Sequence, residues 1–391
     1  MAKFFIYNEG TCVRLKLFGE DIKKLFILNG WQESIKSKAD YILINTCSFL
    51  AVKEKYFLRF IRKKTDCLLA GQQLVVFGCL PATNPLKILK INQNIILFKR
   101  NLDEIADFFQ FKNKKIKLSS IVSNHLSLRN RLINYLNYFV IHNEAINYRL
   151  RKNKVFHLKI SEGCLGRCAY CTEKFTTVYQ SRKIKEIIKE FEEGLRMGFK
   201  YFALNSDDTS AFGADNNEKI ADLLSKILGH KEDYKIAVTE FNPRGLMECK
   251  VLDLFVSPKI IFVTIPIQSG SQRILNLMRR PYLLKQIIPR IKALKRMNPA
   301  LMINTHIIVG FPTEKKEDFK KTLALFDENV FDRVKIFEYS DRPGTESSQM
   351  KGKISNRIIR KRTNKLRKKI LYSAVKRRSL ANFLVNLKTL D

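Results

Sequence analysis

Apolar positions in the first 110 residues fall into short runs separated by longer amphipathic stretches. Short apolar runs predict buried strands, and apolar residues that recur every three or four positions predict helices. The strand-like runs are residues 4–7, 41–44 and 74–77, with a fourth at Phe98. The helix-like stretches are residues 18–28, 52–61 and 102–109. This alternation is typical of an open, mostly parallel α/β sheet, which we expect over residues 1–110.

A second alternating series extends from residue 153 to residue 345. Its strand-like runs are residues 155–160, 201–204, 235–238, 260–263, 302–309 and 334–337. Helices are expected between them at residues 184–197, 218–228, 272–277, 283–296 and 316–326. Six β/α units are too few to close an eight-stranded barrel, so we expect a partial (β/α)6 barrel. Such barrels place their chemistry at the carboxyl ends of the strands.

Two basic segments flank the second series. Residues 111–152 are polar and basic with mixed periodicity, which indicates a linker with some helix at residues 132–140. Residues 346–391 form a basic tail, in which positions 351–391 hold fourteen Lys or Arg residues against Asp391 alone. A four- or eight-residue spacing of apolar residues predicts an amphipathic helix there. The stripe consists of Ile354, Ile358, Leu366, Ile370 and Ala374.

The formal net charge of +35 indicates a negatively charged binding partner. Self-repulsion opposes such an imbalance unless a polyanion or an acidic partner neutralises it. Nucleic acid is the first candidate and an acidic protein surface the second, while charges that simply coat solvated faces are the alternative. No apolar run approaches the roughly 18 residues of a membrane span, and the first residues lack the features of a signal peptide. We therefore expect a cytoplasmic monomer with no membrane partner.

Three of the eight cysteines, Cys164, Cys168 and Cys171, have the spacing C-x3-C-x2-C directly after the first predicted barrel strand. Three thiolates on one tight loop can hold three irons of a 4Fe–4S cube and leave the fourth iron open, because thiolate is the usual protein ligand of such clusters. S-adenosylmethionine could then chelate the open iron. A structural zinc site is the alternative, but it needs a fourth ligand such as His157 or Cys249.

A second set, Cys12, Cys47 and Cys79, follows three successive strands of the first predicted sheet. Ligand sites in such sheets lie outside the carboxyl ends of the strands, so these thiols could converge. The alternative is three buried small hydrophobic residues, which cysteines often are.

Polar residues also follow the other barrel strands, where Gly and Ser allow close backbone approach and Asp can bind ribose hydroxyls. A nucleoside-type ligand is therefore plausible, although each segment taken alone could be an ordinary turn or helix cap. The candidate cofactor-binding residues are Tyr170, Asp207, Asp208, Glu240, Gln268, Ser269, His306 and Gly310.

Taken together, these segments resemble the radical SAM methylthiotransferase family over residues 1 to about 350. The motifs are INTCSF, VFGCLPA, the cysteine loop with Tyr170 before its last cysteine, NSDDTSAFG, IPIQSGSQRILNLMRR, HIIVGFPTE and YSDRPGT. The resemblance implies that Cys164, Cys168 and Cys171 hold the cluster that cleaves S-adenosylmethionine. It implies that Cys12, Cys47 and Cys79 hold an auxiliary 4Fe–4S cluster whose open iron carries the sulfur.

The resemblance also implies an external electron donor, a sulfur donor and a tRNA substrate, modified at an adenosine beside the anticodon. The Leu165-Gly166 pair favours the branch that acts on threonylcarbamoyladenosine. Two departures leave alternatives open. Thr11 and Leu15 replace the family's Gly and Asn around Cys12, and no TRAM-like barrel of strands follows residue 352. The alternatives are methylthiolation of a protein or peptide side chain, and a non-catalytic iron–sulfur RNA-binding protein.

Overall fold

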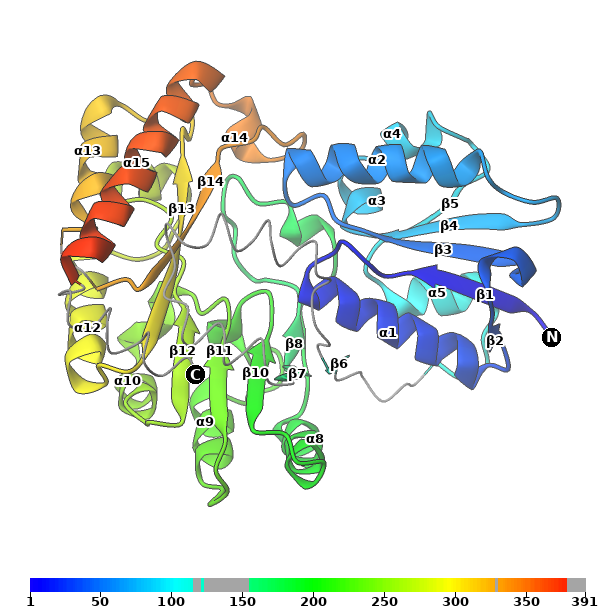
Figure 1. The fold of residues 1–391 in the computed structure, drawn as a ribbon, viewed down its shortest axis with the longest axis horizontal. Coiled ribbons are helices and arrows are strands. Elements are labelled where there is room, and N and C mark those ends of the chain that lie inside the picture. Colours follow the sequence, from blue (N-terminus) through cyan, green and yellow to red (C-terminus); the bar gives the residue numbers. More distant parts are fainter. Residues whose placement is uncertain (115–120, 123–154, 328–329, 378–391) are drawn as a thin grey trace.

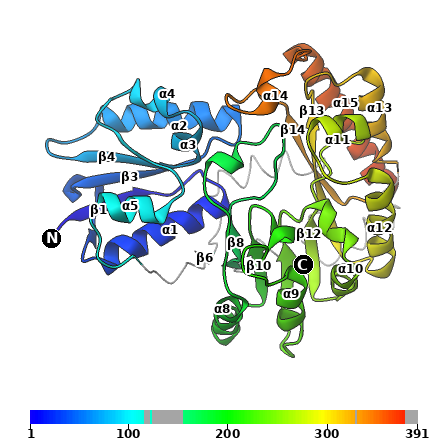
Figure 2. The same cartoon turned by 180° about the vertical axis from the view of Figure 1, so that it is seen from behind.

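The computed structural model describes residues 1–114, 121–122, 155–327 and 330–377. Two α/β units lie side by side, and the helix Asn356–Arg377 lies on the side of the second unit away from the first, whereas the short helix Glu346–Gln349 lies close to the first unit (Figures 1 and 2). The N-terminus lies at the end of the first unit that is away from the second (Figure 1). The parallel strands of the first unit therefore run toward the second unit and end beside it. No helix in the described part of the chain is long and apolar enough to cross a membrane.

The first unit is a five-stranded parallel sheet in the order β2-β1-β3-β4-β5. Its strands are β1 (Lys3–Tyr7), β2 (Gln32–Glu33), β3 (Tyr41–Thr46), β4 (Gln73–Gly78) and β5 (Ile96–Phe98). Its helices are α1 (Val13–Leu28), α2 (Ala51–Thr65), α3 (Cys79–Thr83), α4 (Pro85–Leu89) and α5 (Leu102–Phe108). Successive strand residues point to opposite faces. Leu43 accordingly packs with residues of α1 and α5, whereas Ile42 and Ile44 pack with residues of α2, α3 and α4.

The second unit contains the expected six parallel strands, in the order β14-β13-β12-β11-β10-β7. They are β7 (Val155–Lys159), β10 (Tyr201–Asn205), β11 (Lys235–Val238), β12 (Ile260–Thr264), β13 (Met302–Val309) and β14 (Arg333–Glu338). The helices are α8 (Ile184–Arg196), α9 (Ile220–Leu228), α10 (Cys249–Phe255), α11 (Gln272–Leu277), α12 (Leu284–Met297) and α13 (Lys316–Ala324). The short connecting helices are η2 (Glu173–Phe175), η3 (Thr209–Ala211) and η4 (Pro243–Met247). Both predicted sheets are thus confirmed.

The two faces of the barrel strands differ in chemistry. Outward residues such as Ile303 and Ile307 join the large core shared with the helices. Inward positions carry small residues, among them Val155, Ala203 and Ala237. Polar side chains continue this inner face toward the carboxyl ends, where Asn205 and His306 lie. An interior of this kind leaves room and hydrogen-bonding groups at the carboxyl ends, where the predicted chemistry should take place.

Several small elements were not expected from the sequence. The edge strand β2 and the hairpin of β8 (Ser161–Glu162) with β9 (Gln180–Ser181) are only two residues per strand. Residues Ile121–Val122 of the expected linker form β6, which pairs antiparallel with β7. The helix expected at residues 132–140 lies outside the described residues.

The carboxyl-terminal segment contains α14 (Glu346–Gln349) and the long helix α15 (Asn356–Arg377). The predicted amphipathic helix is confirmed, with Leu366 and Ile370 buried as expected, but near its start Ile359 is buried in place of Ile358. Ile359 is 4% exposed and faces the barrel, whereas Ile358 is 45% exposed. Ile359 packs into the space left by Gly310 (φ 82), where a Cβ would lie 2.4 Å from Cγ1 of Ile359. The spacing of apolar residues does not show which of these two adjacent isoleucines is buried, because Gly310, against which Ile359 packs, lies on another element.

Candidate active site

The loop with Cys164, Cys168 and Cys171 leaves the barrel at the carboxyl end of its first strand, after β7 and β8. The chain turns at Gly163 (φ 73), a backbone conformation that favours glycine. A Cβ at Gly163 would lie 2.7 Å from the carbonyl oxygen of Val178. Glycine therefore lets the loop pass close to the segment before β9.

Each sulfur of this loop accepts one N–H hydrogen bond. The donors and distances are Gly166 N to Cys164 Sγ at 3.2 Å, Glu173 N to Cys171 Sγ at 3.4 Å, and Arg280 Nη1 to Cys168 Sγ at 3.4 Å. Hydrogen bonds to the ligating sulfurs are one of the means by which proteins set the reduction potential of an iron–sulfur cluster. The loop thus holds three thiols with donors already directed at them.

The chemistry of these thiols fits an iron–sulfur cluster. Burial raises the pKa of Cys164 to about 12 and also raises the pKa of Cys171. Without a metal these two thiols are therefore neutral, and coordination deprotonates them. A Cβ at Gly166 would lie 3.1 Å from Cys164 Sγ and 3.8 Å from Cys168 Sγ. The missing side chain keeps the space beside both sulfurs open.

Neither His157 nor Cys249 supplies the fourth ligand that a structural zinc site at this loop would need. His157 Nδ1 lies 3.2 Å from Asn205 Nδ2 on the inner face of the barrel, and Cys249 is exposed at the start of α10. Among the described residues, no group of three His, Cys, Asp or Glu side chains has the spacing of a single-ion site. A cluster, by contrast, takes each thiolate on a different iron.

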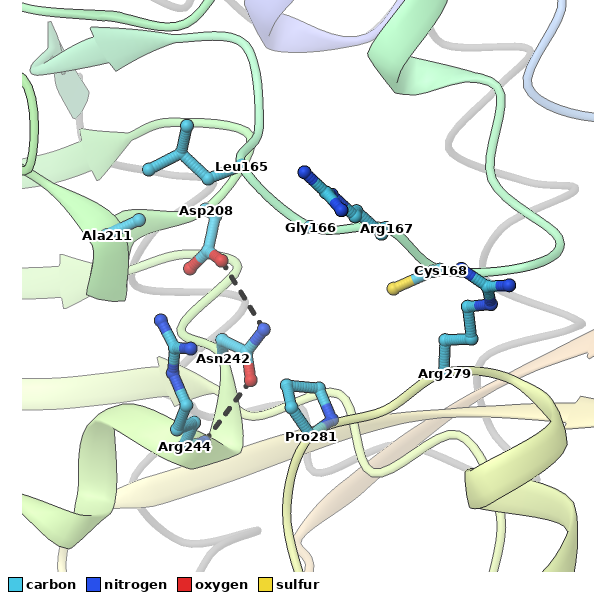
Figure 3. Close-up of a pocket in the computed structure, with 10 residues that line it drawn as sticks. All are labelled: Leu165, Gly166, Arg167, Cys168, Asp208, Ala211, Asn242, Arg244, Arg279 and Pro281. Carbon is cyan, nitrogen blue, oxygen red and sulfur yellow. Dashed lines mark hydrogen bonds between the residues drawn. The ribbon is translucent and has the colours of Figure 1, made fainter.

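A cavity of about 230 Å³ opens beside the cysteine loop. Cys168 and Asp208 line it from opposite sides, and Asn242 and Arg244 of the loop and helix after β11 lie on the side of Asp208 (Figure 3). Asp208 accepts hydrogen bonds from Asn242 Nδ2 at 3.3 Å and from Ser210 Oγ at 2.7 Å. This network fixes a carboxylate at the cavity wall, where it can accept from hydroxyl or amine groups of a ligand.

The other three cysteines lie at the end of the first sheet that faces the barrel. Thr46 and Gly78 are register partners in β3 and β4, so Cys47 and Cys79, the next residues, emerge side by side. Cys12 precedes α1 as its N-cap residue. Burial raises the pKa of Cys79, and Cys47 and Cys12 contribute to that rise. Cys47 and Cys79 thus emerge at the same edge of the sheet, and Cys12 follows the neighbouring strand β1.

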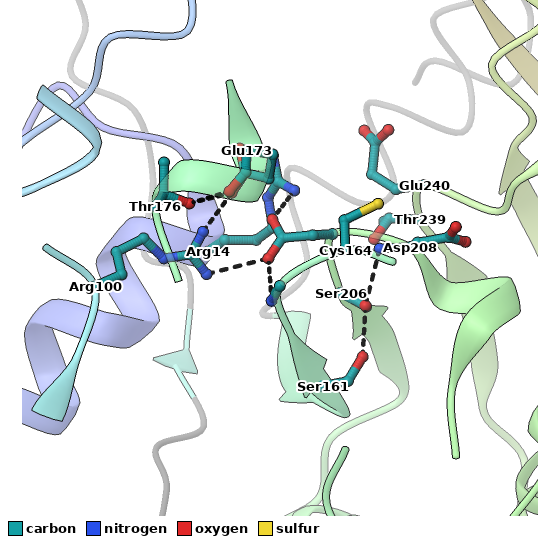
Figure 4. Close-up of polar contacts among 12 residues, drawn as sticks. Arg14, Arg100, Ser161, Cys164, Glu173, Thr176, Ser206, Asp208, Thr239 and Glu240 are labelled. Carbon is teal, nitrogen blue, oxygen red and sulfur yellow. Dashed lines mark hydrogen bonds and ion pairs between the residues drawn. The ribbon is translucent and has the colours of Figure 1, made fainter. Parts of the chain in front are cut away.

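A buried ionic network joins the first unit to the loops of the second (Figure 4). Arg14 of α1 pairs with Asp207 of the loop after β10. Arg100, which follows β5, pairs with Asp207 Oδ2 at 3.2 Å and with Glu173 Oε1 at 2.5 Å. Asp207 Oδ2 also accepts from Gly163 N at 2.8 Å. Both arginines come from the first unit and both carboxylates from the second.

The network lies between the two sets of thiols. Arg14 is two residues from Cys12, and Glu173 is two residues from Cys171. After burial, the nearby Glu173 carboxylate is the largest cause that raises the pKa of both Cys79 and Cys171. One carboxylate is therefore close to a thiol of each set.

The electrostatics of Asp207 follow from its partners. Burial alone would raise the pKa of Asp207, but the guanidinium groups of Arg100 and Arg14 hold it well below its ordinary value. Burial, followed by the Asp207 charge, raises the pKa of Glu173. The network thus holds Asp207 as an anion between two permanent cations.

Three further candidates lie at the carboxyl ends of the central strands. Glu240 and Gln268 have positive φ angles of 49° and 67°, a conformation that is rare for side chains of this kind and concentrates at functional sites. Gln268 Oε1 is buried without a hydrogen-bond partner among the described residues. Glu240 Oε2 lies 3.7 Å from His306 Nδ1, and burial lowers the pKa of His306. These side chains offer acceptors for a polar ligand.

The remaining candidates contact protein groups. Asp207 belongs to the ionic network, and Ser269 Oγ lies 3.4 Å from Thr322 Oγ1 of α13. Gly310 is covered by Ile359 of α15. The Tyr170 ring packs edge-to-face against another aromatic ring, that of Phe311.

Some site residues were not singled out in the sequence. Arg280, inside a quoted family motif, donates to Cys168, and Asn242 and Arg244 line the cavity. Asn242 and Arg244 belong to a polar segment that follows a predicted barrel strand, and this position could have indicated them. The sequence does not show, however, which polar residues of that segment face the cavity. The role of Arg14 could not be predicted from the sequence, because its partner Asp207 is 193 residues away.

The fold and the cysteine loop define a radical SAM protein, and residues 158–326 match the model of the Radical SAM superfamily. Residues 19–98 match the model of the uncharacterized protein family UPF0004. The chain is 30% identical over 358 residues to the probable threonylcarbamoyladenosine tRNA methylthiotransferase of Pyrococcus horikoshii, which covers 90% of this chain and 80% of that protein. The chain belongs to the radical SAM methylthiotransferase family.

Other relatives cover most of the chain as well. The ribosomal protein uS12 methylthiotransferase RimO of Carboxydothermus hydrogenoformans is 28% identical, over 93% of this chain and 81% of that protein. Among solved structures, the radical S-adenosylmethionine methyltransferase TsrM of Kitasatospora setae has a TM-score of 0.63 at 12% identity, over 89% of this chain and 77% of that one. The likeness to TsrM concerns the fold alone.

Proposed function

We propose that the protein adds a methylthio group to threonylcarbamoyladenosine in tRNA, using S-adenosylmethionine and two 4Fe–4S clusters. The observation that carries this proposal is the contact between η2 and α3: η2 begins at Glu173, whose N–H donates to Cys171 Sγ at 3.4 Å, and α3 begins at Cys79. The Pyrococcus horikoshii relative supports the choice of nucleoside. The net charge of +35 supports an RNA substrate.

Each triplet has a separate task in this proposal. Cys164, Cys168 and Cys171 would hold the cluster beside the cavity, and Cys12, Cys47 and Cys79 the auxiliary cluster. When bound, the clusters supply the electron that cleaves S-adenosylmethionine and the sulfur that is transferred. An external reductant and a sulfur donor complete the requirements.

The chain's own side chains would position S-adenosylmethionine at the cavity. Asp208 and Glu240 are acceptors for its amine or ribose hydroxyls. Gln268 presents a buried carbonyl oxygen without a partner among the described residues. His306 lies beside Glu240, and Tyr170 packs behind the cysteine loop. Asp207, Ser269 and Gly310 would act indirectly, by fixing the loops that carry these groups.

The exposed side of α15 would bind RNA phosphates. Its exposed basic residues are Arg357, Arg360, Lys361, Lys365, Arg367 and Lys368. Contacts of this kind release counterions, so the affinity for RNA should fall steeply as the salt concentration rises. The amphipathic packing of α15 on the barrel is compatible with this role, because the two faces of the helix are used separately.

The proposal is tested with protein reconstituted with iron and sulfide under anaerobic conditions. The wild-type protein should release deoxyadenosine from S-adenosylmethionine, and Cys164→Ala should release none. Cys67→Ala, which changes an exposed cysteine outside both triplets, is the matched control and should retain the activity. Deoxyadenosine from Cys164→Ala at the wild-type rate would overturn the cluster assignment.

A protein substrate is the second candidate, because the RimO relative is similar over nearly the whole chain. Mass spectrometry of tRNA nucleosides from a strain without the gene separates the two. Loss of methylthio-threonylcarbamoyladenosine from that strain supports the RNA substrate. An unchanged nucleoside profile with a lost methylthio group on a protein supports the alternative.

A further inference from the structure

Lys335 is a cation on the inner face of the barrel. Its register partner across β13 and β14 is His306, and register partners in parallel strands point to the same face. The Lys335 Nζ lies 4.9 Å from the centroid of the Phe337 ring. That ring is 5.3 Å from the His306 ring and 5.4 Å from the ring of Phe49, which belongs to the first unit. Lys335 therefore lies where the barrel interior meets the first unit.

The surroundings of Lys335 place it on the side of the auxiliary cysteines, because Phe49, whose ring contacts that of Phe337, is two residues from Cys47. The Lys335 side chain is exposed, as expected for a side chain in an open interior. Burial lowers the pKa of Lys335, and Glu240, Cys12, Arg14 and Cys47 are the charged or titratable groups that act on it next.

The described part of the chain supplies no carboxylate as an ion-pair partner for Lys335. Asp207 is held by Arg14 and Arg100. Glu240 lies next to His306, and its proposed task is to bind S-adenosylmethionine. Lys335 therefore presents an ammonium group on the inner face without an ion-pair partner among the described residues, and the position suits an anion brought by the substrate.

We infer that Lys335 is a specificity-determining residue that binds the carboxylate of the substrate's threonylcarbamoyl group. The inference rests on the proposed function. Threonylcarbamoyladenosine carries a free carboxylate on the threonine attached to its base, so the anion stays close to the reacting ring. An ammonium on a flexible stem can follow it, and a charge-assisted hydrogen bond in a partly dry interior is stronger than a neutral one. An adenosine without this group would leave Lys335 unpaired and bind more weakly.

The test measures the affinity of the iron-loaded protein for short anticodon stem–loop RNAs by fluorescence anisotropy. One RNA carries threonylcarbamoyladenosine, and a second carries the same group with its carboxylate converted to a neutral carboxamide. The wild-type protein should bind the carboxylate form roughly tenfold more tightly. Lys335→Gln should bind both forms equally, at the affinity of the wild-type protein for the carboxamide. Lys335→Arg should restore part of the preference.

Lys226→Gln is the matched control, because it removes the same charge from the exposed end of α9. It should leave the preference for the carboxylate unchanged. The iron content and the far-ultraviolet circular dichroism spectrum of Lys335→Gln should match those of the wild-type protein, which confirms that the variant is folded and loaded. Equal binding of both RNAs by the wild-type protein, or an unchanged preference in Lys335→Gln, overturns the inference. If the wild-type protein methylthiolates neither RNA, the proposed function itself fails.

Discussion

At the scale of single residues, the cysteine loop is defined by the donors that face its sulfurs. Two of the three are backbone N–H groups, which mutation of a side chain cannot remove. The third is the buried Arg280 guanidinium, which donates to Cys168 Sγ and also to the carbonyl oxygen of Pro266 at 3.0 Å. Arg280 is thus the one of these donors that brings a full positive charge next to a ligand sulfur.

Replacing Arg280 with Met should lower the reduction potential of the cluster in the cysteine loop. Removing a positive charge and a hydrogen bond disfavours the more negative, reduced state. The measurement is a redox titration followed by electron paramagnetic resonance. Arg196→Met is the control, since Arg196 is exposed in the last turn of α8 and does not line the cavity. Equal potentials in the wild type and Arg280→Met would show that Arg280 does not act on the cluster.

At the scale of elements, the outer helices fix loops that end beside the site. α13 holds the segment after β12 through Thr322, and α15 covers Gly310 after β13. Arg362 of α15 also pairs with Glu314 Oε2 at 2.6 Å, and the same carboxylate oxygen accepts from Gly310 N at 3.1 Å. The basic helix therefore supports the strand ends from outside while its other face stays in solvent.

The register of α15 predicts opposite effects for two adjacent isoleucines. Ile359→Ala should reduce the free energy of unfolding by about 2–4 kcal/mol, because it leaves a cavity against Gly310. Ile358→Ala removes a half-exposed side chain and should change the free energy of unfolding by less than about 1 kcal/mol. Urea unfolding followed by circular dichroism measures both. Equal losses would contradict the register of the helix.

At the scale of the whole molecule, three groups of buried charges join the two units. Besides the Asp207 network, Lys159 pairs with Asp21 of α1. Arg342, which follows β14, pairs with Glu54 of α2 at 2.5 Å. Buried pairs of this kind add little net stability, but breaking one is costly because a charge remains without its partner. They therefore define one relative position of the two cysteine sets.

Asp207→Asn should destabilise the protein by about 3–5 kcal/mol, because Arg14 and Arg100 would keep their buried charges with only Glu173 opposing them. The midpoint of urea unfolding measures the loss. Asp107→Asn is the control, since it breaks an exposed ion pair with Lys114, and such pairs contribute little to stability. If both variants unfold at the same urea concentration, the network does not hold the two units together.

The sequence by itself determined the order of elements, both sheets, the two cysteine triplets and the family. These features are local: apolar periodicity marks strands and helices, and the spacing of Cys164, Cys168 and Cys171 is set within eight consecutive residues. Even the proximity of Cys47 to Cys79 could be predicted from the sequence, because parallel strands end at one edge of a sheet.

Only the tertiary structure decided how distant segments meet. It joined Asp207 to Arg14 and Arg100, turned Ser269 and Gly310 toward outer helices, chose Ile359 over Ile358, and directed Arg280 and Lys335 at the site. Such contacts depend on how the two units dock and on which face of an element meets its neighbour. A shift of one residue along a helix turns a different face toward the neighbouring element, and the local sequence pattern does not show which face makes the contact.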